Sequence, residues 1–194
     1  NSIHCCFDVK DYMSLVSFYR PTIMESSDRT LLDAARHGRV GKLYELIVKK
    51  ASLEVEDVDE STPLMLAASY GHTDSVKMLI EENAMVEAVN RNKSTPLMYA
   101  AYNGYVDVVK VLLAANAALD VRDCTQHTPL MYAAMKNNAD AASALIAAKA
   151  ALDVENKEKR TALMLAAYNG HTKVAKVLIE AKATLDKVDI KSRT

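Results

Sequence analysis

The chain is short of the residues that usually build loops and cross-links. It has 5 glycines, 4 prolines and 3 cysteines among 194 residues, and two of the cysteines, Cys5 and Cys6, are adjacent. This spacing gives no disulfide framework, so we expect a reducing, cytoplasmic setting. No apolar run approaches the roughly 20 residues that a membrane-spanning helix needs, and the N-terminus shows no signal-peptide pattern. We therefore expect no membrane insertion.

Neither sign of charge dominates. There are 24 Lys and Arg against 25 Asp and Glu, which leaves a formal net charge of -1. A balance of this kind gives no general attraction to nucleic acid or to an anionic membrane, so no nucleic-acid partner is expected. Neither a GxxxxGK[ST] nor a GxGxxG segment is present, and we therefore expect no cofactor.

Two groups of histidine and cysteine are candidates for metal binding or nucleophilic chemistry. His4 stands directly before Cys5 and Cys6, but adjacent cysteines lack the C-x2-C spacing of zinc sites. Cys124 lies three residues before His127, without a third group that would orient the histidine. The sequence therefore predicts no metal site and no catalytic residue, and we do not expect an enzyme.

The feature that the chain does have is self-similarity with a period of 33 residues. Thr-Pro-Leu begins at Thr62, Thr95 and Thr128, and Thr-Ala-Leu at Thr161 continues the series. The same period holds for Ala-Ala pairs, for a turn glycine or asparagine after them, and for a leucine farther on. A unit this short cannot bury its own apolar face, so it must stack on its copies as a solenoid. The units are 29–61, 62–94, 95–127, 128–160 and 161–193.

The second unit shows the structural role of each recurring residue. Thr62 is placed to cap a helix, and Pro63 follows at the first helical position, where its missing N–H costs nothing. We expect Gly71 to end this helix with a positive φ. A second helix over 73–82 buries apolar residues at i, i+3 and i+4, and 86–94 then extend as a hairpin toward the next threonine. The expected fold class is an all-α repeat solenoid of five such units, each a helix-turn-helix with a β-hairpin tip.

This pattern resembles the ankyrin repeat, whose T-P-L-x-x-A-A-x-x-G-H signature stands here between Thr62 and His72. The resemblance covers residues 29–193 and implies five stacked ankyrin repeats, the first of which, 29–61, looks like an N-terminal capping repeat. Methionine replaces the family's histidine after T-P-L in four units, which implies apolar packing there in place of the family's hydrogen-bond network. This Met-rich form is similar to ankyrin arrays of some protists, some of which are attached to NimA-related kinase domains.

Glycine is missing at two positions of each unit where the ankyrin pattern has it. The residues found there instead are Lys50, Asn83, Asn116, Lys149 and Lys182 after the second helices, and Glu60, Lys93, Gln126 and Lys159 in the hairpins. Asparagine tolerates a left-handed backbone fairly well, whereas lysine should cost on the order of 1 kcal/mol per site. We expect hairpins that deviate somewhat from the consensus geometry.

The resemblance also implies that a partner protein binds the concave face, which is made by the hairpin tips and the first helices. Tyrosine and methionine on this face would form a discontinuous stripe of interface anchors, although the same rings could instead shelter neighbouring helices. The candidate partner-binding residues are Arg36, His37, Ser69, Tyr70, Arg91, Asn92, Tyr102, Asn103, Thr125, His127, Met135, Lys136, Lys157, Arg160, Tyr168 and Asn169.

Charge is uneven along the hairpins. It is acidic around the first one, from Glu54 to Glu60, and mainly basic later, as at Arg91, Lys157 and Arg160. If this gradient is functional, it would orient an extended partner with its acidic end toward the C-terminal repeats.

The two ends of the chain lie outside the five units. Apolar residues between Val9 and Arg20 suit an amphipathic helix that Pro21 stops. This helix, within residues 1–28, either covers the edge of the first repeat or is the tail of an upstream domain. At the other end the period places the opening threonine of a sixth unit at Thr194, so we expect a piece of a longer array.

Taken together, the sequence predicts a monomeric scaffold or adaptor that binds another protein through the concave face of the array. The alternative is a targeting or regulatory segment of a larger multidomain enzyme, such as a protein kinase. The sequence does not identify the partner, because a fold does not specify one.

Overall fold

The computed structural model of the chain describes residues 26–191. Within this span ten helices stand in five consecutive pairs, and no strand is present. The first helices of the pairs are α1 (Ser26–Arg36), α3 (Pro63–Ser69), α5 (Pro96–Asn103), α7 (Pro129–Met135) and α9 (Ala162–Tyr168). The second helices are α2 (Val40–Val48), α4 (Thr73–Glu81), α6 (Val106–Ala114), α8 (Ala139–Ala147) and α10 (Thr172–Glu180).

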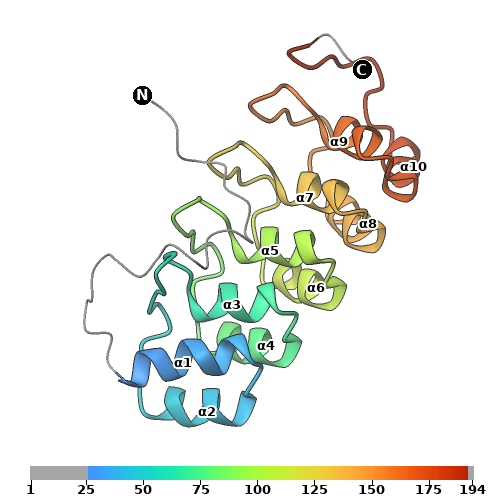
Figure 1. Cartoon of the computed structure of the whole chain (residues 1–194). Helices are drawn as coiled ribbons and strands as arrows, with labels where there is room; N and C mark the ends of the chain where they lie inside the picture. Colours follow the sequence, from blue (N-terminus) through green and yellow to red (C-terminus); the bar gives the residue numbers. More distant parts are fainter. Residues whose placement is uncertain (1–25, 192–194) are drawn as a thin grey trace, which may run out of the picture.

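The pairs stack into a curved array (Figure 1). Each first helix packs on its own second helix and on the first helix of the next pair. The connection from each second helix to the next first helix projects to the same side of the array as a hairpin-shaped loop. The expected all-α solenoid of stacked helix pairs is confirmed. The expected N-terminal helix and the opening residue of a sixth unit lie outside the described residues.

The threonine that opens each of the second to fifth units caps its first helix as predicted. The Oγ1 atom of Thr62 accepts a hydrogen bond from the N–H of Met65 at 3.4 Å, and Pro63 occupies the first turn. The same bond recurs in the next three units, at 3.3 to 3.4 Å. Gly71 follows the helix with φ +76°, as expected for a left-handed residue after a helix end.

The methionines that replace the family's histidine lie in the interior. Met65, Met98 and Met131 are each 1% exposed, and Met164 is 9% exposed. All four are thus buried hydrophobic residues, and Met131 belongs to the continuous cluster of leucines and paired alanines along the array. Apolar packing at this position, as the sequence suggested, is therefore what the structure shows.

Every position where glycine was missing adopts the left-handed backbone that glycine would take. The φ values after the second helices run from 61° to 76°. The four hairpin residues have φ values of 58° to 66° and repeat one another closely. Lysine and glutamate thus adopt the same left-handed backbone. The missing glycines therefore lower the stability of the folded protein and leave the backbone conformation of the tips unchanged.

An acidic column at the bases of the hairpins joins each repeat to the next. The Glu87 carboxylate accepts a hydrogen bond from the N–H of Ala118 at 2.8 Å, 31 residues further on. Equivalent bonds run from Met85 to Glu54, from Ala151 to Asp120 and from Thr184 to Asp153. These carboxylates hold the stack together through charge-assisted hydrogen bonds.

The residue after the turn glycine also reaches back to the preceding repeat. A ring nitrogen of His72 lies 2.9 Å from the carbonyl oxygen of Arg36, and His171 has the same relation to Ala134. These two histidines therefore have structural partners.

Candidate interaction surface

The hairpin tips are fixed by a column of Asp and Asn side chains. The Oδ1 atom of Asn156 accepts the N–H groups of the residues two and four positions further on, both at 2.9 Å. Asp57, Asn90 and Asp123 do the same in their own hairpins. We did not single out this column from the sequence, although its 33-residue spacing is visible there. Such side-chain turns give the tips a defined shape.

Neighbouring tips are joined through their backbones. The N–H of Cys124 donates to the carbonyl of Asn92 at 2.9 Å. Equivalent bonds run from Arg91 to Asp59, from Lys157 to Thr125 and from Ile190 to Glu158, at 3.1 to 3.3 Å. The tips of the five hairpins thus form one continuous ridge, which we call the tip ridge (residues 57–61, 90–94, 123–127, 156–160 and 189–191).

Four predicted residues come together beside the middle of this ridge. The Lys136 ammonium lies 4.5 Å from the ring centroid of Tyr102, which is a cation–π arrangement. Tyr132 also contacts Tyr102: the two rings meet edge-on, with their centroids 5.7 Å apart. His127 lies against Tyr132 with a centroid separation of 5.5 Å, and Thr125 contacts His127.

Tyr132 and its counterpart one unit earlier, Tyr99, tie the first helices to the tips. The Tyr132 hydroxyl donates to Asp123, and the Tyr99 hydroxyl accepts from the Asn90 amide at 2.8 Å. Burial, and for Tyr132 also the hydrogen bond to Asp123, raise the pKa of both phenols above their ordinary value. These two tyrosines are not among the candidates selected from the sequence, and their partners stand nine residues earlier in the chain.

His127 is held in one tautomer. The Asn156 amide oxygen is already bonded to two tip N–H groups, so its NH2 group faces the His127 Nε2 atom, 3.0 Å away. Nε2 must then accept, and the ring proton sits on Nδ1, which faces the Thr125 hydroxyl. Burial lowers the pKa of His127 below its ordinary value, while Asp123 and Glu158 act in the opposite direction.

A second cation–aromatic pair lies farther along the array. The Arg160 guanidinium is 4.9 Å from the ring centroid of Tyr168. Arg160 also pairs with Glu158 at 2.9 Å and with Asp189 at 3.3 Å, and only 16% of its side chain is exposed. It therefore links two tips and a first helix, whereas Tyr168 is 67% exposed.

The N-terminal candidates are spread more widely. Arg36 pairs with Asp57 at 3.2 Å, so its charge is already partnered within the protein. Tyr70 is 50% exposed and stacks on His72 with centroids 6.4 Å apart. His37 is exposed and turns toward Asp33, whose carboxylate lies 3.0 Å from the ring nitrogen.

The remaining candidates lie at helix ends or on the ridge. Asn103 donates to the Ser69 carbonyl at 3.0 Å, and Asn169 donates to a carbonyl of its own helix. Met135 is partly buried against the core. On the ridge, Arg91, Asn92 and Lys157 are all exposed.

No group of three or more His, Cys, Asp and Glu side chains that could hold a metal ion occurs among residues 26–191. His4 and its neighbouring cysteines lie outside that part of the chain. None of the helices in the same part has the length and apolar character needed to cross a membrane. A surface hollow of about 490 Å³ lies at the edge of the tip ridge, where Gln126 and Asn156 line it together with Arg122 and Lys187. Another, of about 510 Å³, lies between α6 and α8.

Comparison with known proteins agrees with this geometry. The family model described as ankyrin repeats in three copies matches residues 31–123 and again residues 115–189. No curated protein matches the chain significantly. The two family matches together span most of the sequence and all of the described helices except residues 26–30 of α1. The chain therefore belongs to the ankyrin-repeat family, whose repeats are protein–protein interaction modules and are typically not catalytic.

Proposed function

We propose that the protein is a non-catalytic scaffold or adaptor that binds a partner protein through the tip ridge and the adjoining ends of the first helices. The proposed contact residues are the candidates from Arg36 to Asn169 named above. Binding by a rigid face of this kind needs no cofactor, and the partner's side chains supply the specificity.

The observation that carries the proposal is the arrangement around Tyr102 and Tyr168. Each ring has a cation, Lys136 or Arg160, packed on its face, and Tyr168 keeps two thirds of its surface exposed. Tyrosine offers a large amphipathic contact with few rotatable bonds, so little side-chain entropy is lost when a partner covers it. The backbone bonds between tips further reduce the cost of ordering the surface.

Pull-down of partners from an extract of the source cells tests the proposal. The double variant Tyr102→Ala and Tyr168→Ala is expected to lose most of the captured partner. Replacing an interface anchor of this type by alanine often costs about 2 kcal/mol of binding free energy. Tyr44→Ala is the matched control, because Tyr44 is 61% exposed but lies on α2, in the row of second helices. Equal capture of the partner by the double variant and by the unchanged chain would contradict the proposal.

The same surface would also serve as the targeting segment of a larger enzyme such as a protein kinase. In that arrangement the array binds the partner and a domain elsewhere in the polypeptide performs the chemistry. Sequence determination of the intact transcript distinguishes the two cases.

A further inference from the structure

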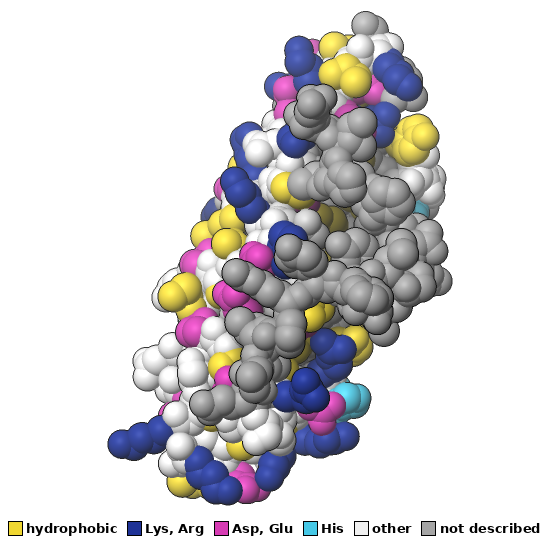
Figure 2. All heavy atoms as spheres, turned by 60° about the vertical axis from the view of Figure 1, so that its left-hand side comes forward, with side chains coloured by type: hydrophobic (Ala, Val, Ile, Leu, Met, Phe, Trp, Pro, Cys, Tyr) yellow, Lys and Arg dark blue, Asp and Glu magenta, His cyan; other side chains and the backbone are white. Residues whose placement is uncertain are grey.

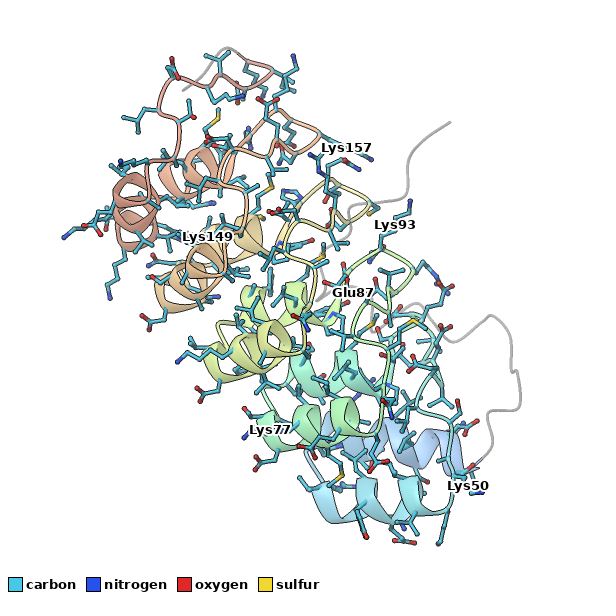
Figure 3. All side chains as sticks on the ribbon, turned by 180° about the vertical axis from the view of Figure 1, so that it is seen from behind. Lys50, Lys77, Glu87, Lys93, Lys149 and Lys157 are labelled. Carbon is cyan, nitrogen blue, oxygen red and sulfur yellow. The ribbon has the colours of Figure 1, made fainter. Side chains whose placement is uncertain are left out.

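The hairpins contain charges of both signs, and the fold separates them by place. The carboxylates at the bases, such as Glu87, face the next repeat and are engaged by its backbone N–H groups. Lys93 and Lys157 stand instead at the tips, on the side of the array away from the second helices (Figure 3). The sequence shows mixed charge in each hairpin, whereas the structure places exposed lysines at the later tips, where Asp123 and Asp189 are buried and Glu158 is paired with Arg160.

Four lysines of the later hairpins have no counter-charge among the residues that the structure describes. Lys93, Lys157, Lys159 and Lys191 are all exposed, and none makes an ion pair with any residue that the structure describes. We call these four side chains the lysine row. Other ridge cations differ, since Arg160 is held by two carboxylates and is largely buried.

The first hairpin has the opposite character. Glu60 occupies the position of Lys93, Gln126 and Lys159 in the later tips. Asp59 occupies the position of Asn92, Thr125 and Glu158, and the Glu158 carboxylate is paired with Arg160 at 2.9 Å. Figure 2 shows Lys and Arg side chains recurring along the upper part of this face, with some Asp and Glu side chains among them, and side chains of both signs farther down. The first tip is therefore more acidic than the later tips, where exposed lysines recur.

The lysine row is also fixed in spacing. Lys157 takes part in the backbone bond to Thr125, and the neighbouring tips are joined in the same way. Lys93 and Lys159 have φ values of 59° and 58°, so their side chains leave the tip in the same direction relative to its backbone. A row of ammonium groups on a fixed backbone suits a ligand that is itself extended and bears repeated negative charge.

We propose that the lysine row binds an acidic, extended segment of the partner protein, with the acidic residues over the hairpins that follow α4, α8 and α10. This inference rests on the proposed function and specifies the chemistry of the partner. The exposed ring of Tyr168 lies on the helix between the last two of these hairpins and would take an apolar or aromatic side chain of the same segment.

The test uses a fluorescein-labelled peptide of ten glutamates and follows its anisotropy as the full chain is added. The charge reversals Lys93→Glu, Lys157→Glu and Lys159→Glu are combined in one variant. Glutamate is compatible with the left-handed tip, because Glu60 already adopts φ 61° at the equivalent position of the first hairpin. The control combines Lys77→Glu, Lys110→Glu and Lys173→Glu, three exposed lysines on α4, α6 and α10 with the same change in net charge.

The peptide is expected to bind the unchanged chain. Binding should be weaker at 0.2 M than at 0.05 M salt, because salt screens the attraction between exposed charges. Each reversal should weaken binding by a factor of about two to three, so the ridge variant should lose about tenfold in affinity. The control variant should stay close to the unchanged chain. Circular dichroism and thermal unfolding verify that both variants fold.

Equal affinity of the ridge variant and the control would overturn the inference. Tighter binding of a labelled thymidine 20-mer than of the peptide, at the same salt, would assign the lysine row to nucleic acid and also overturn it. If the peptide does not bind while partner capture still depends on Tyr102 and Tyr168, the acidic segment is wrong and the proposed function stands.

Discussion

Replacing Lys149 by glycine should stabilise the protein, although glycine usually destabilises. Lys149 follows α8 with φ 76°, and its N–H donates to the Ile146 carbonyl at 2.9 Å in the turn that ends the helix. Its side chain is exposed and makes no ion pair within residues 26–191, so truncation removes little else. Figure 3 shows its position at the end of the second helix.

The magnitude follows from two opposing terms. A left-handed L-residue costs about 1–2 kcal/mol. Glycine avoids this cost, but it lowers the stability of the folded state by about 0.5–1 kcal/mol because the unfolded chain gains conformational freedom. The net gain is therefore about 0.5–1 kcal/mol, which for a chain of this size raises the midpoint of thermal unfolding by about 2–4 °C for each kcal/mol.

Calorimetry or urea unfolding measures this difference, and Asn116→Gly supplies the control. Asn116 occupies the same turn after α6 with φ 61°, but asparagine tolerates the left-handed region, so its replacement should change stability less. If Lys149→Gly is destabilising, or no better than Asn116→Gly, then the backbone strain assigned to the lysine positions is wrong.

Three further outcomes follow from named groups. Ser75→Ala should raise the unfolding free energy by about 1 kcal/mol, because the fully buried Ser75 hydroxyl has no hydrogen-bond partner in the described structure; unchanged or lower stability in urea would contradict this. Glu87→Ala should cost about 1 kcal/mol through loss of its bond to the Ala118 N–H, whereas Glu87→Gln keeps an acceptor and should restore most of the loss; equal stability of the two variants would show that the bond contributes nothing. Because burial holds the pKa of His127 below its unfolded value of about 6.5, the unfolded chain takes up the proton first as pH falls. The stability that the buried neutral His127 contributes is thus complete above pH ~6.5 and is lost as pH falls through the folded pKa. The urea midpoint of His127→Gln should therefore vary less between pH ~7.5 and ~5 than that of the unchanged chain. Identical pH profiles would show that the pKa of His127 is not lowered in the folded protein.

The regular part of the fold could be predicted from the sequence because its causes are local or periodic. A threonine that caps, a proline in the first turn and a residue with positive φ at the helix end act within one unit, and the period repeats them. The helix over 73–82 was placed to within one residue of α4. The burial of the methionine column was expected on another ground, because methionine stands where the ankyrin pattern has a hydrogen-bonding histidine.

The surface could be predicted only in part, because its contacts join different units. The bond between His127 and Asn156 spans 29 residues and depends on how two tips lie side by side. Glu87 and Lys93 stand six residues apart in one hairpin, and only the fold shows that one faces the next repeat and the other faces outward. Spacing alone does not provide that distinction.

A photocrosslinking comparison tests the central claim most directly. Benzoylphenylalanine replaces Tyr168, beside the tip ridge, in one version of the chain and Tyr44, on α2, in another; the two positions are 67% and 61% exposed. We predict that illumination in an extract of the source cells links the first version to a partner protein and leaves the second unlinked. Crosslinking of the same partner from the Tyr44 position alone would place binding on the second helices and contradict the account.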